Sequence, residues 1–238
     1  NTTEIGIVYS DDNIHFSPPV TYPGKLLSVL YERFRGFEGD PSKGMIIIPT
    51  EMIINNGKIL RDILIRLSEF NGLEQPFIQW LKVSNHFCNS LVDRIVPGRL
   101  SAKDQAKVQG VFGYKDELMI MAEPFRLWAI EARSEKIRRE LSFVNQEDGM
   151  IVTDNIGKYV ELKLRVLNGT HTFLCGLAIR CGFATVHEAM SDNDFLLFAQ
   201  KLMYDEICVS LQSELISYEE ARKYATTIVS RFQYPFIE

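Results

Sequence analysis

The sequence lacks a membrane-spanning segment and an excess of basic charge. No apolar run approaches the ~20 residues of a transmembrane helix, and no signal peptide is recognisable. The 26 lysines and arginines are outnumbered by 31 aspartates and glutamates, which gives a net charge of −5 and a pI near 5.5. Nucleic-acid-binding surfaces are basic, so we expect no nucleic-acid partner and no membrane partner. The one basic cluster, at residues 133–139, is interleaved with Glu135 and is typical of a solvated helix face.

Cysteine and histidine are scarce, with four residues of each. The cysteines lie in apolar surroundings without CxxC spacing, which is typical of buried free thiols in a reducing cytoplasm. These are Cys88, Cys175, Cys181 and Cys208. The histidines have no metal-ligand spacing either. We therefore expect a cytoplasmic protein without a metal site.

The chain is nevertheless long and apolar enough to bury a core. It has 238 residues, 46% of them hydrophobic, which suggests one or two domains. Apolar patterns predict strands near residues 5–9, 45–48, 89–96, 118–122, 127–130 and 150–152. They predict helices at 24–37 and 57–70, from residue 76, and around the basic cluster. The run at 45–48 is continuous, as in strands buried on both faces of a parallel sheet.

Only helices are predicted after about residue 153. Thr185 with Glu188 and Ser217 with Glu220 have the spacing of capping boxes, and Ser191 with Asp194 is a similar helix-start signal. We therefore expect an α/β domain over residues 1–152 followed by an all-α domain over residues 153–238.

Three polar residues interrupt the apolar, largely buried helix predicted at residues 161–182. They are Lys163, Asn168 and His171. On an α-helix, His171 lies ~80° and Asn168 ~140° around the axis from Lys163, so one broad face would present all three to one cavity. Burying them is costly unless each has a partner, which a substrate with several hydroxyls would supply. Any one of them is more often solvated or satisfied locally, so the trio does not by itself define a reaction.

The same residues fit the pattern Lys-x4-Asn-x2-His, which resembles the active-site signature of the polyol-specific long-chain dehydrogenases, the mannitol dehydrogenase family. Three more segments are similar to motifs of that family: Asn-Asn-Gly at 55–57, Asn-Ser-Leu-Val-Asp-Arg-Ile-Val-Pro at 89–97 and Ala-Glu-Pro-Phe-Arg-Leu-Trp at 122–128. The resemblance implies the later part of a Rossmann-type dinucleotide-binding domain, then the start of a multi-helical substrate domain. It also implies NAD as cofactor and metal-independent, reversible hydride transfer at a secondary alcohol or ketone.

Within that family, residues 1–6, 49–53, 87–94 and 167–172 most resemble the tagaturonate reductase branch. That branch reduces tagaturonate, a sugar acid, to altronate in hexuronate catabolism. By this resemblance Lys163 is the general acid/base, Asn168 binds the carbonyl or alkoxide oxygen, and His171 orients a hydroxyl and the Lys163 ammonium. An exposed lysine titrates near 10.4, so burial or a neighbouring cation such as Arg165 has to lower its pKa.

The resemblance assigns further residues to the cofactor and the substrate. Asn89 and Asp93 are expected near the nicotinamide, although an Asp93–Arg94 pair tying a strand end is as good an interpretation. Thr3 is assigned to the cofactor side, although a simple turn would have the same sequence. Glu51 is expected to contact the substrate, directly or through another residue.

Two other positions have weaker implications. Other branches have an Asp-Asn pair where this chain has Glu51-Met52, so oxyanion binding would depend more on Asn168. Glu123 is expected to be structural.

The family also suggests that the chain is the central portion of a longer enzyme. Members begin with a glycine-rich pyrophosphate turn and continue past a segment like residues 234–237 into helices with basic substrate ligands. Three interpretations stay open: a tagaturonate-reducing enzyme, a fructuronate or mannitol-type enzyme, and a non-catalytic helical interaction module. The oligomeric state is not predicted.

Overall fold

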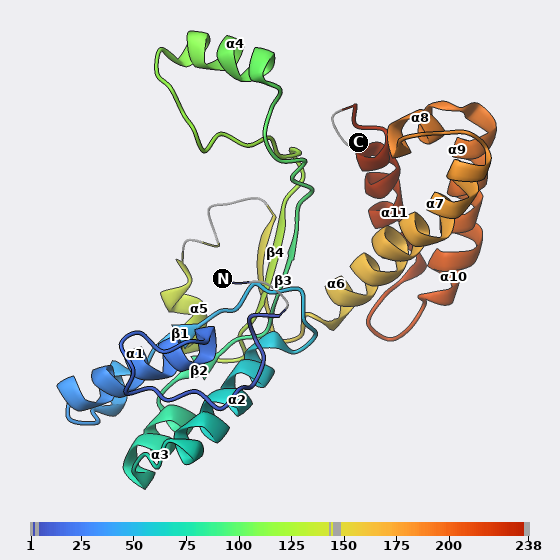
Figure 1. Cartoon of the computed structure of the whole chain (residues 1–238). Coiled ribbons are helices and arrows are strands. Elements are labelled where there is room, and N and C mark those ends of the chain that lie inside the picture. The colour runs from blue at the N-terminus through green and yellow to red at the C-terminus, as the bar shows by residue number, and fades with distance from the viewer. Residues whose placement is uncertain (1, 3–4, 143, 145–148, 236–238) are drawn as a thin grey trace. The chain divides into compact units, whose positions relative to one another are not determined.

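The computed structural model describes residues 2, 5–142, 144 and 149–235, and its contacts divide the chain into two compact units (Figure 1). The first unit comprises Asn1–Val92 and Leu127–Ile156, and the second comprises Asp93–Arg126 and Gly157–Glu238. The chain thus crosses from one unit to the other three times. By its contacts, the segment Asp93–Arg126 belongs to the same unit as the C-terminal helices.

The first unit combines short parallel strands with three long helices. Its elements are α1 (Tyr22–Gly36), η1 (Pro41–Lys43), β1 (Ile46–Ile47), α2 (Asn56–Phe70), α3 (Gln75–Val83), β2 (His86–Phe87), β3 (Ser90–Asp93, whose last residue is in the second unit), β4 (Leu127–Glu131), α5 (Glu135–Glu140) and β5 (Met150–Thr153). β1 pairs parallel with β2, and β4 pairs parallel with β5 in a sheet of order β3-β4-β5.

The apolar run at residues 45–48 is a strand between two cores, as predicted. Ile47 packs with the leucines of α1 and α2 and with Phe77, whereas Ile46 and Ile48 pack against a second cluster around Ile130. Successive side chains of a strand point to opposite faces, so a run of isoleucines is what both cores require. The predicted helices at 24–37, 57–70 and from residue 76 correspond to α1, α2 and α3.

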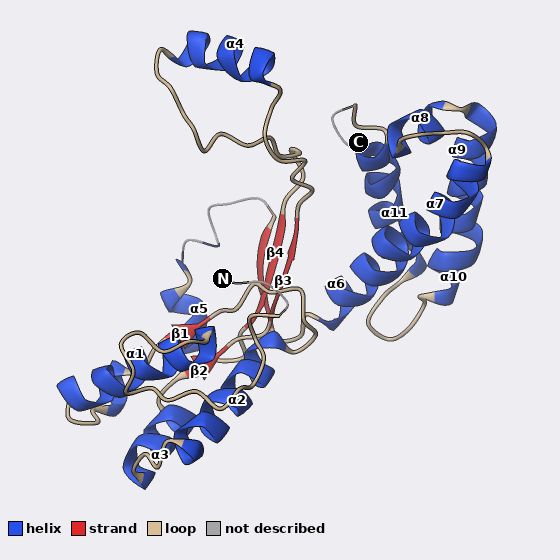
Figure 2. Ribbon diagram, viewed as in Figure 1, coloured by secondary structure: helices blue, strands red, loops and turns tan. Residues whose placement is uncertain are grey.

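The second unit contains an excursion from β3 and a compact group of helices. The excursion carries α4 (Ala102–Phe112) at its tip, and the helical part comprises α6 (Gly157–Glu161), η3 (Leu162–Gly169), α7 (Thr170–Arg180), α8 (Val186–Ser191), α9 (Asn193–Lys201), η4 (Leu202–Ile207), α10 (Cys208–Ser210) and α11 (Tyr218–Phe232). Figure 2 shows helices joined by loops in this helical part. Both predicted capping boxes form, at Thr185 and at Ser217.

Two of the predicted strands are absent from the described residues. Around residues 5–9 the chain turns instead, because Gly6 lets the Thr2 side chain approach so closely that a Cβ there would lie 1.9 Å from Thr2 Oγ1. At residues 118–122 only a single bridge forms, between Met121 and Gly98, and Leu118 is 82% exposed.

Other expectations need smaller corrections. The cap of α9 is Asp192, one residue after Ser191, because the Asp192 carboxylate accepts the Phe195 N–H at 2.9 Å. All four cysteines are free, but Cys175 and Cys181 are exposed because α7 buries only Thr170 and Leu174. The prediction of one largely buried helix over residues 161–182 is therefore wrong for its second half. Within the described residues, no helix is long and apolar enough to cross a membrane.

Candidate active site

The Lys163 segment is not an α-helix. Leu162–Gly169 forms the π-helix η3, inserted between α6 and α7. Hydrogen bonds in a π-helix run between residues five apart, so such residues lie nearly above one another. Lys163 and Asn168 are five apart, and the predicted angle of ~140° between them is therefore wrong. The wider turn therefore places residues 163 and 168 on the same side of the helix.

Lys163 is buried, with 5% of its surface exposed. Burial lowers its pKa below the ordinary value of 10.5; Asp93 partly opposes this, and Arg231 lowers the pKa further. The expected neighbour Arg165 is not the cation responsible, since it is half exposed and pairs with Glu161 at 2.9 Å. A buried amine with a depressed pKa can give up a proton more readily than a surface lysine.

Arg231 of α11 binds two buried carboxylates from the segment Asp93–Arg126. Its Nη1 and Nη2 donate to Asp93 at 2.8 and 3.0 Å, and its Nε and Nη2 donate to Glu123 at 2.9 and 2.7 Å. The guanidinium also lies 4.1 Å from the centre of the Phe125 ring. Asp93, Glu123 and Arg231 are each less than 5% exposed. These charge-assisted, bidentate pairs fix the segment against α11.

The partner of Asp93 is therefore Arg231, together with the Tyr224 hydroxyl, which donates to Asp93 Oδ2 at 3.2 Å. Burial and the Asp93 charge raise the pKa of Tyr224 above its ordinary value. Arg94, the alternative partner considered from the sequence, donates its Nε to the Glu123 carbonyl oxygen instead. Both oxygens of Asp93 are engaged within the second unit.

His171 lies in different surroundings from Lys163. It is exposed, at the start of α7, with its ring centre 6.1 Å from that of Phe232. It lines a cavity of only about 30 Å³ whose other walls are apolar, among them Leu174 and Met190, and which neither Lys163 nor Asn168 lines.

In the first unit, Glu51 follows β1 and is 4% exposed. Its Oε1 accepts the Thr2 N–H at 2.5 Å, whereas its buried Oε2 has no hydrogen-bond partner among the described residues. Asn56 fixes this turn: its Nδ2 donates to the carbonyl oxygens of Pro49, Glu51 and Ser90, and its Oδ1 accepts the Ser90 N–H, all at 3.0 Å. A buried, half-satisfied carboxylate suits a hydrogen-bond donor from a ligand.

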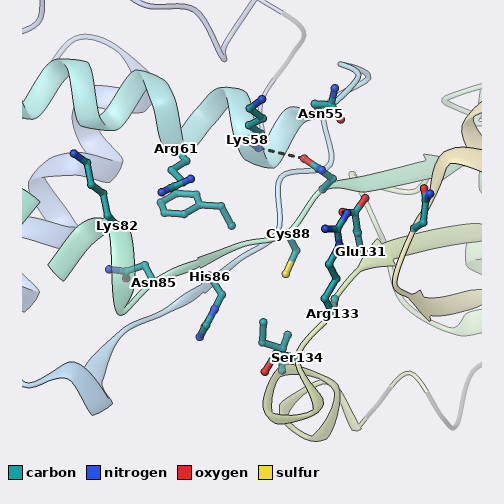
Figure 3. Close-up of a pocket in the computed structure, with 15 residues that line it drawn as sticks. Asn55, Lys58, Arg61, Lys82, Asn85, His86, Cys88, Glu131, Arg133 and Ser134 are labelled. Atoms are coloured by element: carbon teal, nitrogen blue, oxygen red, sulfur yellow. Dashed lines mark hydrogen bonds and ion pairs between the residues drawn. The ribbon is translucent and has the colours of Figure 1, made fainter. Parts of the chain in front are cut away.

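Asn89 lines a larger cavity of the first unit, of about 730 Å³ (Figure 3). Its Oδ1 accepts the Lys58 N–H at 3.2 Å, near the start of α2. The cavity is lined by four cationic side chains and one carboxylate, namely Lys58, Arg61, Lys82, Arg133 and Glu131. This charge excess suits an anionic ligand.

Some site residues were missed or lie outside the structure. Thr3, assigned to the cofactor side, is outside the described residues. Arg231 and Tyr224 were not predicted, although an arginine between Val229 and Phe232 in the apolar stripe of α11 is a usable signal of a buried ion pair. Within the described residues, no group of three or more His, Cys, Asp or Glu lies close enough to hold a metal ion.

Comparison with known proteins finds two family matches in succession along the chain. The Mannitol dehydrogenase Rossmann domain family matches residues 1–142, and the Mannitol dehydrogenase C-terminal domain family matches residues 155–238. The altronate oxidoreductase of Shigella flexneri is 38% identical over 239 residues, covering 100% of this chain and 48% of that enzyme. The chain thus spans about half the length of the curated relatives it matches.

Two solved structures share the fold. D-sorbitol dehydrogenase in substrate-free form matches 97% of this chain and 48% of its own, at 20% identity and a TM-score of 0.73. The ternary complex of Pseudomonas fluorescens mannitol 2-dehydrogenase with NAD and D-mannitol matches 98% and 48%, at 24% identity and a TM-score of 0.67. A Rossmann-type part followed by a helical part, both matched by family profiles, identifies this chain as a member of the mannitol dehydrogenase family.

Proposed function

We propose that this chain is part of an NAD-dependent oxidoreductase that reversibly reduces tagaturonate to altronate. The observation that carries the proposal is the buried Lys163, with its lowered pKa, in a chain 38% identical to altronate oxidoreductase over its whole length. The implied substrate is a small sugar acid, and the implied location is the cytoplasm.

Each residue of the trio has a separate role. Lys163 protonates the carbonyl oxygen during reduction and accepts that proton during oxidation. Asn168, on the same side of the π-helix, donates its amide N–H to the oxygen as negative charge develops. The exposed His171 orients a substrate hydroxyl. Met52 has no polar hydrogen to donate, so Asn168 bears more of the oxyanion binding here.

The residues present fit a nicotinamide dinucleotide. Ligands of Rossmann-type sheets bind beyond the carboxyl ends of the strands, where Glu51 leaves a buried oxygen without a partner among the described residues. We assign Glu51 to a cofactor or substrate hydroxyl. Asn89, expected from the sequence near the nicotinamide, is assigned instead to the anionic part of the cofactor, together with the cations of its cavity. When bound, the nicotinamide supplies or accepts the hydride.

The test is turnover by the full-length protein, followed by NADH oxidation with tagaturonate, fructuronate and fructose. Turnover with tagaturonate alone supports the proposal. Turnover with fructuronate or fructose instead would support the proposed hydride transfer and refute tagaturonate as the substrate. If no sugar is reduced, the proposed activity is wrong, and the non-catalytic interaction module becomes the better interpretation.

A further inference from the structure

One carboxylate lies among the cations of the large cavity in the first unit. Of the described residues that line this cavity of about 730 Å³, four are lysine or arginine, and only Glu131 carries a carboxylate (Figure 3). The four cations attract an anionic ligand, whereas the carboxylate repels one. The cavity as a whole therefore matches a ligand that combines anionic groups with hydrogen-bond donors.

The backbone of Glu131 is fixed at the carboxyl end of β4. Its N–H donates to the Asn89 carbonyl oxygen at 2.8 Å, and it lies opposite Thr153 in the parallel pair of β4 and β5. Its side chain is 19% exposed, so solvent reaches only part of it. Rossmann-type sheets bind their ligands beyond the carboxyl ends of strands, which is where this carboxylate lies.

The ion pair between Glu131 and Arg133 is weak. Arg133 Nη2 lies 3.3 Å from Glu131 Oε1, and the arginine side chain is 76% exposed. Exposed ion pairs contribute little to stability, because water competes for both groups. A carboxylate has about four acceptor positions, of which this pair takes one. The neighbouring Cys88 adds no charge near neutral pH, because burial and the charge of Glu131 raise the pKa of its thiol to about 11.

We propose that Glu131 determines the preference for NAD over NADP by accepting hydrogen bonds from the adenosine ribose hydroxyls of the cofactor. This inference rests on the proposed function, which assigns the cations of the same cavity to the anionic part of the cofactor. In NADP one of these hydroxyls carries a phosphate, which brings negative charge against the carboxylate in place of a donated proton. Glu131 thus binds one cofactor and repels the other.

A general effect of charge is the competing explanation. Removal of any negative charge from a cationic cavity strengthens the binding of every anion, and therefore of NADH and NADPH alike. Loss of a direct contact has the opposite effect on NADH, because its ribose hydroxyls lose the group that accepts their hydrogen bonds. The sign of the change in NADH affinity therefore distinguishes the two explanations.

The test is the dissociation constants of NADH and NADPH for the full-length protein without sugar, measured by titration of the nucleotide fluorescence. We expect Glu131→Ala to bind NADH about tenfold or more weakly, the usual effect of losing hydrogen bonds to a charged group, and to bind NADPH more tightly. Glu131→Gln retains one acceptor oxygen and should weaken NADH binding less. The matched control is Glu135→Gln, because Glu135 is 78% exposed and does not line the cavity, and it should leave both constants unchanged.

Opposite changes for the two nucleotides support the inference. Tighter binding of both, unchanged NADH binding in Glu131→Ala, or equal changes in Glu135→Gln overturn it. If Glu131→Ala does not fold, Glu131→Gln decides the question by the same signs. The titration requires no turnover, so opposite changes in an inactive protein would refute the proposed function alone. Turnover by a protein whose NADH binding does not depend on Glu131 would refute this inference alone.

Discussion

Replacement of Asn56 by alanine tests how the carboxyl end of β1 is held. Asn56 is fully buried, and its side chain bonds to Pro49, Glu51 and Ser90. Through these bonds it joins the end of β1, the start of α2 and the start of β3. The same turn carries Glu51, so the residue supports one part of the proposed cofactor site.

The magnitude follows from the groups left without partners. In Asn56→Ala the Ser90 N–H and carbonyl oxygen both lose a buried hydrogen bond, and Glu51 loses one to its carbonyl oxygen. Each unsatisfied buried group costs about 1–3 kcal/mol, which is offset by less than about 1 kcal/mol of improved helix propensity. We expect a loss of roughly 3 kcal/mol in the free energy of unfolding of the first unit, a large share of an ordinary domain's stability.

The assay is urea unfolding followed by tryptophan fluorescence. Both tryptophans of the chain, Trp80 and Trp128, lie in the first unit, so the signal reports on that unit. The matched control is Asn55→Gly, since Asn55 is exposed, makes no capping hydrogen bond and has a φ of 59°, which glycine adopts freely. If Asn56→Ala costs no more than Asn55→Gly, the bonding assigned to Asn56 does not stabilise the fold.

Three further changes test other parts of the structure. Because the pKa of Lys163 is lowered by burial, the unfolded chain binds more protons between that pKa and the ordinary 10.5, and stability should rise with pH across this window. Lys163→Met should be more stable than the parent protein at pH values below this window, and its stability should not rise with pH across it, as measured by urea unfolding followed by far-UV circular dichroism. Parallel plots of stability against pH for the two proteins would contradict this. Gly57→Ala should cost about 1–3 kcal/mol by tryptophan fluorescence, because its Cβ would lie 2.5 Å from the Cys88 carbonyl oxygen; an unchanged midpoint would refute that close approach. Ser217→Ala should cost about 1 kcal/mol by circular dichroism through loss of the α11 capping box, and Ser213→Ala, which leaves this cap intact, should cost less.

Features with a local cause could be predicted from the sequence. The capping boxes at Thr185 and Ser217 depend on residues three apart, and the strand near Ile47 depends on a continuous apolar run. The helix-start signal at Ser191 was wrong by one residue because Asp192, also a good cap, competes for the same N–H. The prediction of a strand at residues 5–9 was wrong because a strand needs a hydrogen-bonded neighbouring strand, which an apolar pattern does not guarantee.

The site was less predictable for reasons of distance and backbone geometry. Motif resemblance singled out Lys163 and Asn168. The angle between them around the helix axis was wrong, because it assumed an α-helix and the local sequence pattern does not indicate a π-helix. Arg231 and its carboxylates are 138 and 108 residues apart in sequence, so no spacing rule connects them. The proposed chemistry required burial or a neighbouring cation to lower the pKa of Lys163. Burial has the larger effect, and the cation that adds to it is Arg231 and not the adjacent Arg165.

The function proposed above depends on Lys163 as the acid/base group of a hydride-transfer enzyme. Its most direct test is the rate of tagaturonate reduction by full-length Lys163→Ala, with and without added methylammonium. We expect a loss of about 10²- to 10⁴-fold, the usual contribution of general acid–base catalysis, with partial recovery as the free amine replaces the missing one. A variant within tenfold of the parent rate, or a large loss that no amine restores, would contradict it.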